Sequence, residues 1–256
     1  MLIADEYHTK LLEAHQIFTK LLCKAESPDY KFKQQRAYDY YVHGLCRRAM
    51  IIRRNLNYFI TVIPPTRKNT LNYDDISETT MHINSFYINL YGCLDNIAWM
   101  ILYELNMFNC QNKEEAYFKF KVDLFKNEFL NEIGQIDEIF ANFFHTKKSW
   151  YINLKTYRHP SAHRFPLYIV PQVFSKPEDV QHFYELREKS LMEACNRNFE
   201  ESKKLIKKQQ SIGVFPHLMA HDLSQQPTVL YPTIFDDCFT LDEIVGEAFK
   251  LLERLS

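Results

Sequence analysis

The chain has 256 residues, of which 46% are hydrophobic and 25% are charged, and its formal net charge is −1. This length and composition allow a large buried core without disulfide or metal stabilisation, and the near-zero charge excludes nucleic-acid binding by a uniformly basic surface. The five glycines are scattered singly along the chain. That distribution excludes the glycine-rich phosphate loops of P-loop and dinucleotide-binding enzymes.

The N-terminal segment and the cysteines bear on the cellular compartment. The first residues lack the basic and apolar regions of a signal peptide, and the longest strongly apolar run, 97–102, is too short to span a bilayer. We therefore expect a cytoplasmic protein without a membrane partner. In that compartment we expect reduced, buried thiols at the six cysteines, which are Cys23, Cys46, Cys93, Cys110, Cys195 and Cys238.

Three long helices are predicted in the first half of the chain. An amphipathic helix is expected from Ile3 to about Ala25, where Ser27-Pro28 ends it. A second is expected from about Phe32 to Ile63, where Pro64-Pro65 ends it. A third, from about Ile76 to Met107, is apolar on most sides. That pattern is typical of a central helix covered by its neighbours.

The second helix has one apolar and one basic side. Its apolar residues recur at intervals of four and three and share one face: Leu45, Ala49, Ile52, Leu56, Phe59 and Ile63. At about 100° per residue, four basic residues fall within about 20° of one another on the opposite side: Arg36, His43, Arg47 and Arg54. This stripe is either an ordinary solvated face or a track for an RNA backbone, with the three arginines as candidate RNA-binding residues.

Shorter elements are predicted in the second half. We expect helices at about 114–126, 136–144, 150–157 and 178–210, and strands at 167–170, 213–215 and 228–231 that could form a small sheet. Thr240 is predicted to cap a final helix from Leu241 to Leu255, with Glu243 completing a capping box. The sequence therefore predicts a mainly α fold: a single domain, 1–256, of long antiparallel helices with a small β element.

The segment Arg158-His159-Pro160-Ser161-Ala162-His163 is the candidate for chemistry. A guanidinium matches phosphate oxygens, and an imidazole exchanges protons near neutrality, so the pair suits a phosphodiester. Pro160 is predicted to push His159 out of the helical conformation and to start a new turn that runs to Phe165. His163 would lie in that first turn, where the helix dipole favours a neutral imidazole beside an anion.

Asp95 is a carboxylate inside the apolar run of the third helix. A buried carboxylate without a partner is costly, so it needs a cation or several hydrogen bonds. We expect Arg158 to be that cation. The alternative is that Asp95 faces water or caps local backbone.

The candidate segment resembles the motif of the HEPN superfamily of helical nucleotide-binding domains. That motif is an arginine, a polar residue directly after it and a histidine four to six residues after the arginine. Arg158, His159 and His163 fill these positions, and Arg164 follows as in many of these domains. The sequence LDNIAW around Asp95 also resembles the long helix that packs behind the motif. The resemblance covers about 35–210, and the irregular or β segment and final helix of 211–256 have no counterpart.

The resemblance implies a metal-independent endoribonuclease of a toxin–antitoxin, antiphage or CRISPR-associated system. His163 would take the proton of a ribose 2′-hydroxyl, Arg158 would stabilise charge on the phosphate, and His159 would position or protonate. Asp95 and Arg164 would support them. The products would be a 2′,3′-cyclic phosphate and a 5′-hydroxyl. The implied partners are single-stranded RNA, a second copy of the chain in a homodimer, and an antitoxin or defence-system protein, and no cofactor is implied.

Two other interpretations stay open. A non-catalytic helical module of the same type would bind RNA, nucleotide or a protein partner and would show binding without turnover. A metal-dependent hydrolase would use His217, His221 and Asp222, because two histidines four residues apart share one face of a helix. Metal analysis of the purified protein separates the last hypothesis from the others.

Overall fold

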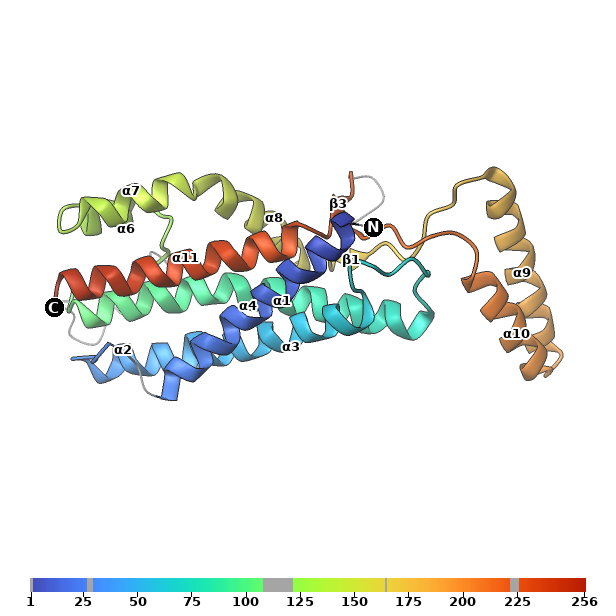
Figure 1. The fold of residues 1–256 in the computed structure, drawn as a ribbon, viewed down its shortest axis with the longest axis horizontal. Coiled ribbons are helices and arrows are strands. Elements are labelled where there is room, and N and C mark those ends of the chain that lie inside the picture. The colour runs from blue at the N-terminus through green and yellow to red at the C-terminus, as the bar shows by residue number, and fades with distance from the viewer. Residues whose placement is uncertain (1, 27–29, 108–121, 164, 222–225) are drawn as a thin grey trace.

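Long helices running side by side form most of the molecule, and a small antiparallel sheet lies between them and a projecting helical hairpin (Figure 1). The structure is a computed structural model that describes residues 2–26, 30–107, 122–163, 165–221 and 226–256, with the backbone alone at 2, 24–26 and 161–163. The mainly α fold predicted from the sequence is confirmed.

The second predicted helix is a continuous helical run with three parts. These are α2 (Gln35–Asp39), a π-helix η1 (Tyr40–Cys46) and α3 (Arg47–Val62). The six residues of the predicted apolar face are all buried. The four basic residues are all exposed, as predicted. However, a π-helix rotates less per residue than an α-helix. The angular spread of about 20° among the four basic residues was calculated at about 100° per residue, so it does not apply across η1.

The central helix of the bundle is α4 (Tyr73–Glu104). The Asn72 side chain caps it by accepting a hydrogen bond of 2.8 Å from the Asp75 amide. It packs against α2, η1 and α3 on one side and against α8 (Lys148–His163) and α11 (Thr233–Arg254) on others. The helix predicted over 76–107 and its central position are confirmed.

The helices at the two ends of the chain belong to the same bundle. Helix α1 (Leu2–Glu26) packs against α3 and α11, and α11 packs against α4 (Figure 1). The predicted start of the last helix is wrong, because α11 begins at Thr233 and contains Thr240. Buried Ile234, Phe235 and Cys238 extend the apolar face upstream of the local capping signal. The bundle is thus not confined to 35–210.

Two short helices, α6 (Asn127–Gly134) and α7 (Glu138–Thr146), precede α8. The helix predicted over 136–144 corresponds to α7, whereas α6 was not predicted. Most of the helix predicted over 114–126 lies outside the described residues.

The long helix predicted over 178–210 is two helices, α9 (Pro177–Cys195) and α10 (Phe199–Gln210). The chain reverses at Arg197, whose φ of 62° is left-handed. The two helices pack against each other as a hairpin that stands away from the bundle, at the end opposite the C-terminus (Figure 1). Residues 177–210 are therefore an appendage of the bundle.

The sheet contains β1 (Tyr168–Ile169), β2 (Leu218–Ala220) and β3 (Thr228–Val229) in the order β1-β2-β3, all antiparallel. Strands predicted at 167–170 and 228–231 are confirmed in shorter form. The segment 213–215 contributes only the isolated bridge between Val173 and Val214. The central strand β2 was not predicted.

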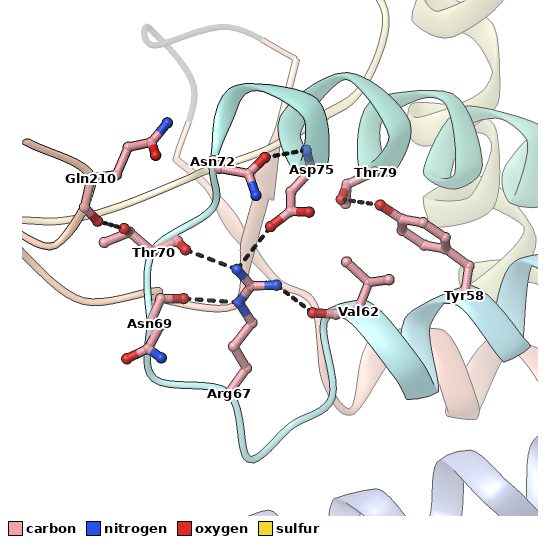
Figure 2. A network of polar contacts seen from close by, with 9 residues as sticks. All are labelled: Tyr58, Val62, Arg67, Asn69, Thr70, Asn72, Asp75, Thr79 and Gln210. Atoms are coloured by element: carbon pink, nitrogen blue, oxygen red, sulfur yellow. Dashed lines mark hydrogen bonds and ion pairs between the residues drawn. The ribbon is translucent and has the colours of Figure 1, made fainter. Parts of the chain in front are cut away.

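A polar network around Arg67 joins three parts of the molecule (Figure 2). The guanidinium donates to the Val62 carbonyl at 2.6 Å, which caps the end of α3, and to the Asp75 carboxylate at 2.9 Å, at the start of α4. It also donates to the Thr70 carbonyl, and the Thr70 hydroxyl donates to the carbonyl of Gln210 at the end of α10. The network therefore fixes the α3–α4 turn and the base of the hairpin together.

Among the described helices none is long and apolar enough to cross a membrane. Cysteine burial was predicted correctly at Cys46, Cys93 and Cys238, and incorrectly at Cys23 and Cys195, which are exposed. Both exposed thiols lie on amphipathic helices, α1 and α9, which have a solvent side. Cys110 lies outside the described residues.

Candidate functional site

The end of α8 carries the candidate motif, and the predicted break at Pro160 is absent. The helix continues to His163, with Pro160 inside it. Proline has no N–H for the carbonyl of Thr156, four residues earlier. His221, at the end of β2, lies with Nε2 3.0 Å from that oxygen and Nδ1 3.0 Å from the carbonyl of Phe165. A neutral imidazole carries one N–H and donates to one of these two carbonyls, so in the tautomer protonated at Nε2 the ring replaces the missing backbone donor.

Arg158 and His159 converge above one aromatic ring of α4. The guanidinium carbon of Arg158 is 5.2 Å from the centre of the Tyr91 ring, and the His159 ring centre is 6.0 Å from it. Arg158 Nη1 lies 3.2 Å from His159 Nδ1. Since a guanidinium only donates, Nδ1 accepts and the ring proton is on Nε2. Arg158 is half-buried and His159 is exposed, so the pair lies at the surface.

Asp95 lies one helical turn beyond Tyr91 and is half-buried. Burial raises the pKa of its carboxyl to about 6, the charge of Asp123 adds to the rise, and Arg48 and Arg158 oppose it. Among the described residues no ion pair joins Asp95 to Arg158. The predicted interaction of Arg158 with the Asp95 carboxylate is therefore an electrostatic attraction without an ion pair, and Arg48 attracts the same carboxylate.

A chain of hydroxyl groups lies beneath the pair. The Tyr151 hydroxyl donates to Asp123, and the Tyr91 hydroxyl is 3.0 Å from that of Tyr151. Because Tyr151 gives its only proton to Asp123, Tyr91 donates to Tyr151. Burial raises the pKa of both phenols. The chain holds the Tyr91 ring in place under Arg158.

Sequence reasoning missed these two tyrosines, although their spacing pointed to them. Tyr91 precedes Asp95 by four residues, and Tyr151 precedes Arg158 by seven. Both intervals return to the same face of a helix. The side chain of His163 and the whole of Arg164 lie outside the described part of the chain.

The basic stripe is divided between two hollows. Arg36 and His43 border one of about 310 Å³, together with Asp39, Tyr40, Gly44 and Asn96. Arg54 borders a separate one against His15 of α1. Arg47 lies between them and borders neither within the described surface. The three arginines predicted to bind RNA, Arg36, Arg47 and Arg54, are thus exposed but do not border a common hollow in the described surface.

The residues of the proposed metal site do not gather. His217 directs Nε2 at the carbonyl of Pro64, 3.0 Å away, and His221 is occupied at Thr156 and Phe165. The two histidines flank strand β2, so the helical spacing assumed for them is wrong. Asp222 is outside the described residues, and the described side chains include no group of three or more metal-binding residues.

Comparisons of the chain with protein-family models, with curated proteins and with solved structures gave no match. The resemblance to the HEPN superfamily consequently depends on the motif that begins at Arg158. The geometry of that motif, with its guanidinium and imidazole above Tyr91 at the end of a helix, is the basis for a functional proposal.

Proposed function

We propose that the protein is a metal-independent endoribonuclease of the HEPN type that cleaves single-stranded RNA. The observation that carries this proposal is the placement of Arg158 beside His159 on the Tyr91 ring, at the surface end of α8. Among the described residues the guanidinium donates one hydrogen bond, to His159. Its other N–H groups suit the oxygens of a phosphodiester, which they would bind in pairs.

Each side chain has a distinct role in this proposal. His163 takes the proton of the 2′-hydroxyl, and the oxygen then attacks the adjacent phosphorus as the bond to the 5′-oxygen breaks. Arg158 stabilises the negative charge on the phosphate, and His159 positions the phosphate or supplies a proton. The departing 5′-oxygen takes a proton from solvent. The products are a 2′,3′-cyclic phosphate and a 5′-hydroxyl, and no metal is required.

We further propose that two copies of the chain pair through the motif surface. Two large apolar side chains flank the motif and are exposed, Ile152 to 54% and Phe165 to 61%. A contact between two copies through this surface would bury both side chains. Light scattering of wild type and of Ile152→Lys with Phe165→Lys tests this part: the pair of substitutions should convert a dimer into a monomer.

Incubation of the purified protein with single-stranded RNA in excess EDTA tests the activity. We expect cleavage, and we expect mass spectrometry of the fragments to find cyclic phosphates and 5′-hydroxyls. Cleavage that requires a divalent ion, or that leaves 5′-phosphates, contradicts the proposal. Binding of RNA without any cleavage would instead support the non-catalytic module.

A further inference from the structure

A line of partly exposed side chains connects the motif with a second arginine–aromatic pair. Tyr91, Asp95, Trp99 and Tyr103 follow one another on α4 at intervals of four residues and are all half-buried. Successive members are neighbours on the helix surface, and at about 100° per residue the row turns by about 120° around α4 between Tyr91 and Tyr103. At one end Arg158 lies over Tyr91, and at the other Arg36 lies 5.1 Å from the centre of the Tyr103 ring. Twelve residues of helix separate the ends by about 18 Å.

The far end of this line is a cluster of near-parallel rings. Tyr40 of η1 lies 5.7 Å from Trp99 and 5.5 Å from Tyr103, with interplanar angles of 12° and 18°. Trp99 and Tyr103 are 5.7 Å apart at 24°. We call Tyr40, Trp99 and Tyr103 the aromatic cluster. Offset, parallel rings with partial exposure are the arrangement on which single-stranded nucleic-acid binders stack bases.

A hollow with hydrogen-bonding groups adjoins the cluster. Its volume is about 310 Å³, and Tyr40 and Gly44 form part of its wall. Asp39, His43 and Asn96 bring acceptors and donors to it, and Arg36 borders it. The Asp39 carboxylate repels a phosphate but accepts hydrogen bonds from the amino groups of a nucleobase. The exposed arginines Arg36 and Arg47 lie on the same helical run, and their guanidinium groups suit the phosphates of the strand.

We infer that the aromatic cluster and the adjoining hollow bind a nucleobase of a single-stranded RNA whose backbone extends along α4 to Arg158. This inference rests on the proposed function in one respect, because that function places the cleaved phosphate at Arg158 and so sets the direction in which the strand runs. A duplex does not fit, because its bases are stacked on one another and do not offer their faces to aromatic side chains.

Binding of an uncleavable strand tests the inference independently of catalysis. Fluorescence anisotropy with labelled 2′-O-methyl RNA should show that Trp99→Ala and Tyr40→Ala each weaken binding by about 5- to 150-fold, the range for loss of one base–aromatic stack. Trp99→Phe keeps a stacking ring and should recover most of the affinity. Tyr184→Ala on α9, which removes a ring that is 53% exposed, is the matched control and should bind like wild type.

Two further readouts report on the cluster directly. The chain has two tryptophans, Trp99 and Trp150, so quenching of intrinsic fluorescence by the strand should be largely lost in Trp99→Phe. Arg36→Gln should lower the slope of log affinity against log salt by about 1, as loss of one phosphate contact does. The matched control, Arg187→Gln on the hairpin, should leave the slope unchanged.

The inference is overturned if folded Trp99→Ala and Tyr40→Ala proteins bind the strand within twofold of wild type. Folding of each variant is checked by its circular dichroism and thermal midpoint. A duplex that competes as well as the single strand also overturns it. Loss of binding in these variants together with an absence of RNA cleavage in EDTA would keep the nucleobase site and refute the nuclease. RNA cleavage at the wild-type rate by the cluster variants would refute the nucleobase site and keep the nuclease.

Discussion

His221 illustrates how one side chain can replace a backbone donor. Its ring meets the carbonyls of Thr156 and Phe165, and Pro160 is the reason why the first of these oxygens lacks a helical partner. The imidazole therefore stabilises the end of α8, on which Arg158 is carried.

We expect His221→Ala to lower the free energy of unfolding by about 0.5–1.5 kcal/mol, because the neutral ring donates one hydrogen bond. In a Pro160→Ala background the restored N–H can bond to Thr156, so the same substitution should cost less. Urea denaturation of the four proteins of this double-mutant cycle measures the difference. An equal cost in both backgrounds would show that His221 does not substitute for the missing donor.

Asp237 is a buried carboxyl that accepts a hydrogen bond of 2.8 Å from Trp150 Nε1. Burial raises its pKa to about 7, and hydrogen bonding by the Trp150 and Tyr87 side chains opposes the rise. A raised carboxyl pKa means that the folded state holds a proton which the unfolded state releases near pH 4. This contribution to stability is complete below pH 4 and is lost as the pH rises to about 7.

The unfolding free energy of wild type should therefore fall by up to about 1.4 kcal/mol per pH unit between pH 4 and 7. Asp237→Asn should not show this fall. The variant should be more stable than wild type at pH 8, because it buries no charge. Denaturation curves across this range measure both effects. Parallel pH profiles for the two proteins would show that Asp237 ionises normally in the folded state.

At the scale of elements, two glycines have opposite surroundings. A Cβ on Gly44 of η1 would lie 2.6 Å from the side-chain oxygen of Asn96, whereas one on Gly246 of α11 would meet nothing within 4 Å. The first glycine lets η1 approach α4 closely. The second is an exposed residue within the continuous helix α11.

We expect Gly246→Ala to raise the free energy of unfolding by about 0.5–1 kcal/mol, because alanine loses less backbone entropy in a helix. Gly44→Ala, the matched substitution, should lower it, since Asn96 must move. Chemical denaturation compares the two with wild type. Stabilisation by both would mean that η1 and α4 are not in close contact.

Long elements could be predicted from apolar periodicity, but their interruptions could not. The buried face of α3 follows from the spacing of residues such as Ile52 and Leu56, and the central place of α4 follows from apolar residues on most of its sides. The π-helix brings Gly44 against the distant Asn96, and the helix across Pro160 meets the distant His221. Local signals also misled at Thr240, where the packing of upstream residues decides the start of α11.

The candidate site was predictable in part. The sequence indicated that Arg158 and His159 act together, and the structure places them side by side. It did not indicate that Tyr91 supports them or that His221 holds their helix, because both contacts join residues more than 60 positions apart in the sequence. Such pairings arise from the packing of α4 and the sheet against α8, which no local pattern encodes.

At the scale of the whole molecule, the α9–α10 hairpin packs on itself and is tied to the bundle at its base, where Thr70 bonds to the Gln210 carbonyl. The two helices pack on each other, and Ser202 of one bonds to the Ser190 carbonyl of the other at 2.9 Å. The main-chain bridge between Val173 and Val214 closes their base.

Replacement of 176–211 by a short turn should therefore leave the bundle folded, with a thermal midpoint close to that of wild type and with RNA cleavage in EDTA retained. Differential scanning calorimetry and the cleavage assay measure the two properties. Aggregation or a noncooperative transition of the shortened protein would show that the hairpin is part of the core.

The central claim is that Arg158 and His163 carry the chemistry, and single-turnover cleavage of one RNA in EDTA by wild type and two variants tests it most directly. We expect His163→Ala to lower the rate by about 10²- to 10⁴-fold and Arg158→Ala by about 10³- to 10⁵-fold, with unchanged circular dichroism and with Arg187→Ala as active as wild type. Folded variants that cleave at the wild-type rate would contradict the account.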